Sequence, residues 1–197
     1  MYKSIFKPTF DWIIALVALI LLLPLFLIVA LFIWIDSQGQ VFFIQERLGK
    51  NGKVFKVLKF RSMAVNQPPK LQTGSKLYKN DTRITKVGRF IRKTSIDELP
   101  QLINILKGEM SFIGPRPPVT YFPKRFDDYS EFEKQRFKVK PGISGLAQLR
   151  CREVHDWEVN IPIDVEYVNN YSFAFDLKLF LSSLFVFFRT DNIYRKE

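Results

Sequence analysis

The chain has 197 residues, a formal net charge of +11 and 47% hydrophobic residues, and it contains 20 phenylalanines. So high an apolar content excludes a disordered basic tail, and a mean hydropathy of −0.01 excludes a protein made of many membrane spans. One cysteine, Cys151, excludes an internal disulfide, and one histidine, His155, is too few for a Cys/His zinc site. A partner that is both apolar and anionic, such as a membrane surface, fits this composition.

The first predicted element is a membrane-inserted helix over residues 12–35, which carry no charged side chain. At ~1.5 Å per residue such a helix is long enough to cross a ~30 Å hydrocarbon core. Pro24 lies inside it and predicts a kink. Two arrangements stay open, a kinked single span and a helix that enters and leaves one leaflet. Basic residues on both sides, Lys3 and Lys7 before the run and residues 47–61 after it, favour re-entry, because positive flanks stay in the cytoplasm.

The remaining pattern predicts a mostly helical domain with one short hairpin. Residues 40–45 and 53–60 are rich in aromatic and β-branched residues, and Asn51-Gly52 between them indicates a tight turn. Helices are predicted over 83–93, 96–106, 127–137, 162–170 and 173–188, a loop over 66–82, and rigid turns over 114–118 and 141–145. The last helix is short for a span and is expected to be buried or interfacial. The expected fold is therefore α/β, with a re-entrant membrane helix (1–36) and a compact cytoplasmic catalytic domain with interfacial helices (37–197).

Nearly all the excess charge lies in residues 46–93, which carry fourteen Lys and Arg against two acidic residues. A solvated basic face is one explanation. The other is a surface that binds phosphate groups, whether on a lipid, a nucleotide or a nucleic acid.

The segment from Ser95 to Pro100 is the strongest candidate for chemistry, and it allows two interpretations. Ser95 and Glu98 have the spacing of a capping box at a helix start, which is a structural role. Alternatively, Asp97 and Glu98 are adjacent carboxylates beside the basic segment. Asp97 would then be a nucleophile or a Mg²⁺ ligand, and Glu98 a base or a positioning group.

Three other segments supply candidate phosphate-binding groups. Prolines on both sides of Arg116 hold its guanidinium on a stiff turn, which suits bidentate phosphate recognition. Strand alternation predicts that Lys59 and Arg61 point to the same side. The glycines of segment 141–148 allow the backbone to approach an anion closely.

Together these segments resemble the bacterial sugar transferases, in particular the monotopic polyprenyl-phosphate phosphoglycosyl transferases. The likeness covers roughly residues 1–190: the apolar run with its central proline, then KFRSM, SIDELPQL, MSFIGPRP and PGISGLAQ. One departure is Leu23 before Pro24, where many members have serine.

The resemblance implies an enzyme that moves a sugar 1-phosphate from a UDP-sugar to undecaprenyl phosphate, with Mg²⁺, and releases UMP. It would act at the cytoplasmic face of the bacterial inner membrane, in the first membrane step of glycoconjugate assembly. By the same likeness Asp97 forms a covalent phospho-sugar intermediate and binds the metal, and Glu98 assists the second step. The substrate-binding residues implied are Lys59, Arg61, Arg92, Arg116 and Arg152.

Two other classes of protein share part of this composition. A membrane-tethered nucleic-acid binder would also be basic and aromatic, and a membrane scaffold would also be apolar. Neither explains the Asp97-Glu98 pair together with a stiffly held Arg116. An enzyme without a nucleic-acid partner is therefore predicted, whereas nothing in the sequence identifies the sugar.

Overall fold

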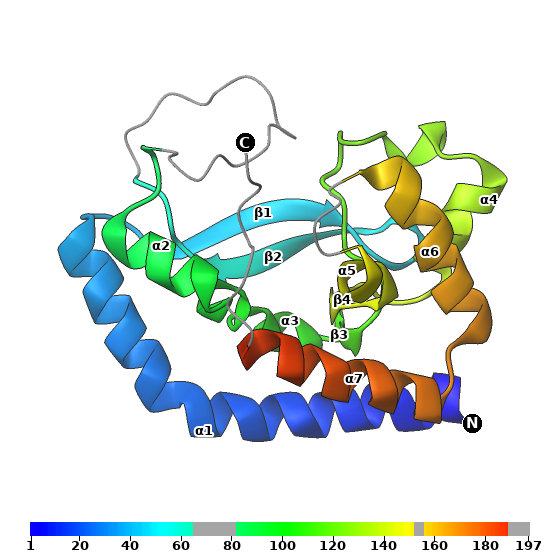
Figure 1. Ribbon diagram of the computed structural model, residues 1–197, viewed down its shortest axis with the longest axis horizontal. Coiled ribbons are helices and arrows are strands. Elements are labelled where there is room, and N and C mark those ends of the chain that lie inside the picture. Colours follow the sequence, from blue (N-terminus) through cyan, green and yellow to red (C-terminus); the bar gives the residue numbers. More distant parts are fainter. Residues whose placement is uncertain (65–81, 152–155, 189–197) are drawn as a thin grey trace.

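The protein is mostly helical, with an antiparallel hairpin and a long apolar helix at the N-terminus (Figure 1). The structure, a computed structural model, describes residues 1–64, 82–151 and 156–188. Its strands are β1 (Phe42–Leu48), β2 (Val54–Phe60), β3 (Ser111–Ile113) and β4 (Gly142–Ser144). Its helices are α1 (Lys7–Asp36), α2 (Lys86–Lys93), α3 (Gln101–Leu106), α4 (Glu131–Lys134), α5 (Leu146–Arg150), α6 (Trp157–Asn170) and α7 (Phe173–Phe188).

The predicted hairpin is confirmed. Strands β1 and β2 pair in register from Phe42 opposite Phe60 to Leu48 opposite Val54. The connecting turn has positive φ at Asn51 (56°) and Gly52 (73°), the conformation that Asn and Gly tolerate best. Strand β1 runs three residues beyond the predicted end at 45, since the charged residues Glu46 and Arg47 also pair with β2.

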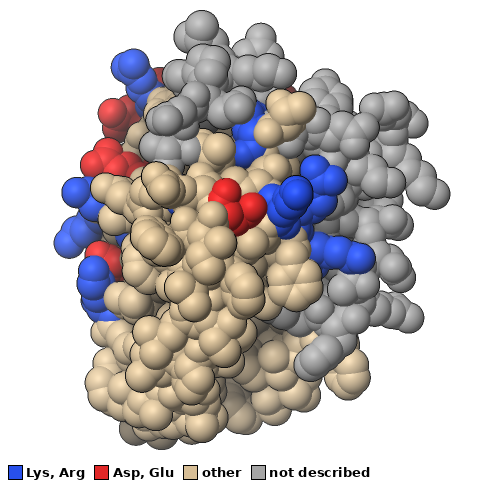
Figure 2. All heavy atoms as spheres, turned by 90° about the vertical axis from the view of Figure 1, so that its left-hand side faces the viewer, with Lys and Arg blue, Asp and Glu red and all other residues tan. Residues whose placement is uncertain are grey.

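Helix α1 supplies much of the apolar surface that holds the domain together. It packs on α2 and α3. Ala15 joins Phe55 and Val57 of β2 in one buried cluster, and Phe26 joins Phe60 in another. The opposite side of the helix stays exposed, and the lower part of the face seen in Figure 2 carries no acidic or basic side chain. An exposed apolar side this long is unusual for a surface in water and fits contact with lipid.

Helix α1 bends part-way along its length (Figure 1). Pro24 lies inside it without a break in the helical assignment. Proline has no N–H to donate to the carbonyl of residue 20, and its ring crowds that carbonyl, so a bend is the expected result.

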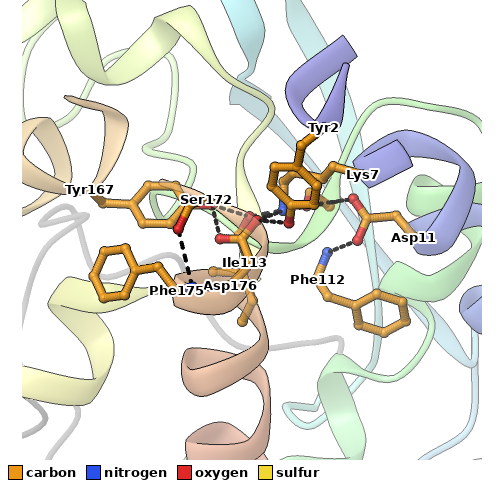
Figure 3. A network of polar contacts seen from close by, with 10 residues as sticks. Tyr2, Lys7, Asp11, Phe112, Ile113, Tyr167, Ser172, Phe175 and Asp176 are labelled. Atoms are coloured by element: carbon orange, nitrogen blue, oxygen red, sulfur yellow. Dashed lines mark hydrogen bonds and ion pairs between the residues drawn. The ribbon is translucent and has the colours of Figure 1, made fainter. Parts of the chain in front are cut away.

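The N-terminal end of α1 is tied to the domain by a buried polar network (Figure 3). Asp176 of α7 lies 2.8 Å from Lys7 Nζ and accepts hydrogen bonds from the hydroxyls of Tyr2 (2.6 Å) and Tyr167 (2.7 Å). Asp11 accepts a hydrogen bond from Ser111 Oγ at 2.7 Å. The first turns of α1 are therefore held against α7, α6 and β3.

The C-terminal end of α1 is tied to the same domain. Asp36 Oδ2 accepts a hydrogen bond from the backbone N–H of Val87 at 2.8 Å, which satisfies a free donor in the first turn of α2. Arg61 donates to the carbonyls of Ser37 and Gln38, directly after the helix. Cations favour this end, where unpaired carbonyls collect. Both ends of α1 thus rest on one domain.

The helix predicted over 96–106 is wrong in its first half. Ser95 has φ of 54°, a left-handed conformation, and its side chain caps nothing. A 3-10 turn, Ile96–Glu98, follows, and α3 begins only at Gln101. The capping-box interpretation is therefore contradicted, because the Glu98 side chain turns away from Ser95.

Elsewhere the helix predictions hold with shorter or longer bounds. Helix α7 matches the predicted range, α2 is shorter than predicted, and α6 begins five residues earlier. The segment predicted over 127–137 is short helix α4 between two 3-10 turns. The sequence did not predict the parallel pairing of β3, just before the first rigid turn, with β4, within the second. Strands of three residues are too short to show a periodic pattern. Except for its last residue, the loop predicted over 66–82 lies outside the described residues.

Candidate active site

The two candidate carboxylates lie on the 3-10 turn between α2 and α3. Its apolar neighbours, Ile96 and Leu99, pack against the cluster that contains Phe26 and Val29 of α1. Ser95, in the left-handed conformation, separates α2 from this turn, and the apolar contacts hold the turn against α1. Asp97 and Glu98 are thereby held beside the apolar cluster that α1 forms with the domain.

Glu98 is fixed by two cations. Lys59 Nζ of β2 lies 2.5 Å from Glu98 Oε1, and Arg116 Nη2 lies 3.6 Å from the same oxygen. Burial by itself would raise the pKa of Glu98, but these cations outweigh it and lower the pKa to about 2. Glu98 is therefore ionised at every physiological pH.

Asp97 is in the opposite situation. In the part of the chain that the structure describes, its carboxylate accepts no hydrogen bond, although the residue is half-buried. Burial and the neighbouring Glu98 raise the pKa of Asp97 to about 6, against the opposing charges of Lys59, Arg92 and Arg116. A carboxylate that is ionised at pH 7, more basic than usual and without partners is suited to attack an electrophile or to bind a metal ion.

Arg92 and Arg116 complete a cationic wall around the pair. Arg92, in the last turn of α2, donates from Nε to Ser62 Oγ at 2.6 Å, and its buried Nη1 has no hydrogen-bond partner. Arg116 is about half exposed. A buried guanidinium N–H without a partner is costly, and an anion beside Asp97 would satisfy it.

The sequence did not point to Arg47, which also lies near this site. It sits on β1, and burial and the charge of Arg116 lower its pKa to about 10. Lys59 lies opposite Phe43 of β1, and side chains two residues apart on a strand share a face. Arg47, four residues after Phe43, therefore lies on the same face as Lys59. Alternation carried beyond residue 45 would have found it.

One predicted substrate-binding residue, Arg61, is not brought to the pair, and another lies outside the described residues. Arg61 follows the end of β2 and is engaged by carbonyls after α1, and no contact joins it to Asp97 or Glu98. Alternation does not extend past the strand end, and the helix terminus offers closer acceptors. Arg152 lies outside the described residues. The roles of both in substrate binding stay predictions.

The residues present fit one Mg²⁺ ion held together with phosphate. Within residues 1–64, 82–151 and 156–188, no three His, Cys, Asp or Glu side chains cluster into a metal site. Mg²⁺, however, is commonly held by one or two carboxylates, with the other ligands from water and substrate phosphates. Asp97 offers a carboxylate without competing hydrogen bonds, whereas the near oxygen of Glu98 is occupied by Lys59.

Comparison with known proteins decides the family. The sequence model of the family described as "Bacterial sugar transferase" matches residues 2–190. The chain belongs to this family. The match includes the helix α1, the hairpin and the carboxylate pair, so the resemblance found in the motifs extends through the whole fold.

Curated relatives of this sugar transferase differ in the sugar that they are named for. It is 39% identical over 188 residues to the UDP-glucose:undecaprenyl-phosphate glucose-1-phosphate transferase of Escherichia coli, covering 93% of this chain and 40% of that protein. It is 40% identical over 182 residues to the UDP-N-acetylgalactosamine-undecaprenyl-phosphate N-acetylgalactosaminephosphotransferase of Aeromonas hydrophila, covering 90% and 42%. Against the exopolysaccharide production protein ExoY of Sinorhizobium fredii, identity is 39% over 195 residues, covering 92% and 84%. The chain spans about two fifths of the length of the first two relatives.

Proposed function

We propose that this sugar transferase moves a sugar 1-phosphate from a UDP-sugar to undecaprenyl phosphate through a covalent intermediate on Asp97. The observation that carries the proposal is the asymmetry of the pair: Glu98 is paired with Lys59, and Asp97 is free with a raised pKa. The names of the relatives supply the substrate class.

In the first step an Asp97 carboxylate oxygen attacks the β-phosphorus of the UDP-sugar. The bond from that phosphorus to the oxygen bridging to the α-phosphorus breaks, and UMP leaves with the electron pair. In the second step an oxygen of undecaprenyl phosphate attacks the same phosphorus, and Asp97 leaves as a carboxylate. Each phosphorylated substrate is thus handled in turn at one site.

The cations have distinct parts in this scheme. In the free enzyme Lys59 and Arg116 are held by Glu98 near the place where the diphosphate would bind. When they engage phosphate, Glu98 loses part of their charge and its pKa rises, so it becomes able to accept a proton or orient the acceptor in the second step. Arg92 would donate its unpartnered Nη1–H to the same anion.

Asp97 would hold Mg²⁺ together with the diphosphate oxygens. The metal, when bound, would neutralise charge on the phosphates and stabilise the departing UMP.

We also propose that α1 is re-entrant and that the catalytic domain lies on the cytoplasmic face of the bacterial inner membrane. Both ends of α1 are bonded to one domain, through Lys7 and Asp11 at one end and Asp36 at the other. A helix crossing the bilayer would separate these ends by a ~30 Å hydrocarbon core. Exposed apolar residues on α7, which lies beside the first half of α1, would add an interfacial contact (Figure 1).

The covalent step is tested with UDP-sugars labelled with ³²P on the β-phosphate. Purified protein with Mg²⁺ and without undecaprenyl phosphate is expected to become labelled and to release one equivalent of UMP. Added undecaprenyl phosphate should then remove the label. A panel of UDP-sugars identifies the donor. Rapid turnover with both substrates but no labelled protein would contradict the covalent route.

The topology is tested with single cysteines at residues 3 and 40, in a background that lacks Cys151. Both positions should be protected from a membrane-impermeant thiol reagent in intact cells and should react after lysis. Reaction at residue 3 alone in intact cells would mean that α1 crosses the membrane.

A further inference from the structure

Three successive carbonyls of the loop that carries Arg116 are each held by a donor from outside the loop. Arg136 Nη2 donates to the carbonyl of Arg116 at 2.8 Å, and Arg47 Nη1 donates to that of Pro117 at 2.9 Å. The backbone N–H of Leu48 donates to the carbonyl of Pro118 at 2.9 Å. Two of the three donors are thus guanidinium groups.

This arrangement follows from the composition of the loop. Pro115, Pro117 and Pro118 have no backbone N–H, so the loop cannot be fixed by donating its own hydrogen bonds in the ordinary way. Proline restricts φ but leaves ψ to be determined by contacts. Carbonyl acceptors are the means by which the rest of the protein can orient the backbone of Arg116.

Both guanidinium groups are engaged mainly by acceptors of the protein itself. Arg136 is 1% exposed, and its Nη2 lies 2.6 Å from Asp164 Oδ2. Its guanidinium carbon lies 5.2 Å from the ring centroids of both Phe137 and Trp157. Arg47 gives Nη1 to Pro117 and Nη2 to Gln45 Oε1 at 2.7 Å. Among the described residues, Arg47 Nε and Arg136 Nη1 are buried without a hydrogen-bond partner.

We propose that Arg47 and Arg136 are positioning residues for the transfer reaction, which hold the Arg116 guanidinium where it meets both Glu98 and the substrate diphosphate. This inference rests on the proposed function. The positive charge of Arg116 also lies close enough to Arg47 to lower the pKa of the Arg47 guanidinium. Repulsion between these two guanidinium groups favours the conformation in which Arg116 Nη2 lies 3.6 Å from Glu98 Oε1, until phosphate binds.

A double-mutant cycle separates positioning from a merely structural role. Arg47→Gln, Arg116→Ala and the double variant are compared with wild type in kcat/KM for the UDP-sugar and in Kd for UDP with Mg²⁺, measured by calorimetry. Arg47→Gln is expected to lower kcat/KM by roughly 10- to 100-fold, because a small misplacement of a positioning group is costly. In the Arg116→Ala background it should lower it less than twofold, since no guanidinium remains to be misplaced.

Arg47→Lys and Arg125→Gln complete the design. Arg47→Lys keeps the charge but cannot reach two acceptors as the planar fork does, so it should lose most of what Arg47→Gln loses; it also replaces Arg47→Gln in the cycle if that variant does not fold. The Arg125 side chain is exposed and makes no hydrogen bond within the described residues, so Arg125→Gln is the matched change of charge and should behave as wild type.

The outcomes divide cleanly. Additive effects in the cycle, or full activity of Arg47→Lys with loss in Arg47→Gln, would overturn positioning and leave a structural or purely electrostatic role. If wild type binds UDP but does not turn over any UDP-sugar, the proposed function fails, and the cycle measured on UDP binding still decides the positioning role. If wild type neither binds UDP nor turns over, both proposals fail.

Discussion

Two pairs of carboxylates in this protein each lie beside a lysine, but they differ in how many of their members accept hydrogen bonds. Asp11 and Asp176 lie at the N-terminal end of α1 with Lys7 beside them, and Asp97 and Glu98 lie on the turn after α2 with Lys59 beside them. In the first pair both members accept hydrogen bonds, from Ser111 for Asp11 and from two tyrosines for Asp176. In the second pair, Glu98 alone has a hydrogen-bond partner among the described residues.

The difference shows that residue type and burial alone do not determine whether a carboxylate is hydrogen-bonded. The pair Asp11 and Asp176 joins four elements, and its charges are compensated by lysine and hydroxyl groups. In the pair Asp97 and Glu98, one anion is poorly compensated. That arrangement costs stability, and under the proposed mechanism it is what would let Asp97 react.

The largest expected effect comes from removing the free carboxylate. Asp97→Asn should lower kcat by at least about 10³-fold, because the amide cannot serve as the nucleophile. UMP release from UDP-sugar with undecaprenyl phosphate in detergent measures it. Asp127→Asn, an exposed acid on a 3-10 turn, is the control and should retain wild-type turnover. Substantial turnover by Asp97→Asn would end the nucleophile assignment.

The next largest effect comes from breaking the pair Asp11 and Asp176. Asp176→Asn should lower the free energy of unfolding by about 3 kcal/mol, because Lys7 loses its closest counter-charge in a buried place. Thermal unfolding in detergent measures the loss. Glu131→Gln breaks an exposed ion pair with Lys134 and should cost under about 0.5 kcal/mol. An equal, small loss in both variants would remove the distinction between the network and an ordinary surface pair.

Asp97→Asn should have the opposite effect on stability. The pKa of Asp97 is about 6 in the fold against the ordinary 3.8, so ionisation is disfavoured in the folded state. The stability given by the protonated form is fully present below pH 3.8 and is lost as pH rises through 6. At pH 8 without Mg²⁺, Asp97→Asn should therefore be more stable than wild type by roughly 1–3 kcal/mol, and the gain should shrink toward pH 4. If Asp97→Asn is less stable than wild type at pH 8, the raised pKa of Asp97 in the folded state is contradicted.

The smallest predicted effect is a shift in pH dependence. Wild-type kcat/KM should fall below pH 6 as Asp97 becomes protonated. Lys59→Met removes a charge that lowers the pKa of Asp97, so the acid limb should move to higher pH by roughly one unit, in addition to a general loss of activity. An acid limb that does not move would mean that another group determines it.

The sequence alone carried much of the site because its groups are local. Asp97 and Glu98 are neighbours, and the flanking prolines restrain the loop that carries Arg116, so both features can be read within a few residues. The apolar helix, the hairpin turn at Asn51-Gly52 and helix α7 were also predictable, since each depends on local composition and period.

Tertiary structure decided what these groups do. Lys59 and Glu98 are 39 residues apart, and their contact exists because β2 packs beside the turn after α2. That contact takes Glu98 from the capping box that its spacing suggested, while Asp97 has no hydrogen-bond partner in the part of the chain that the structure describes. Arg61 turned instead to the end of α1, and the carbonyl contacts of Arg47 and Arg136 have no signature in sequence order. Spacing along a chain determines which groups are neighbours on one element, whereas the pairing of buried charges depends on how elements far apart in the chain meet in space.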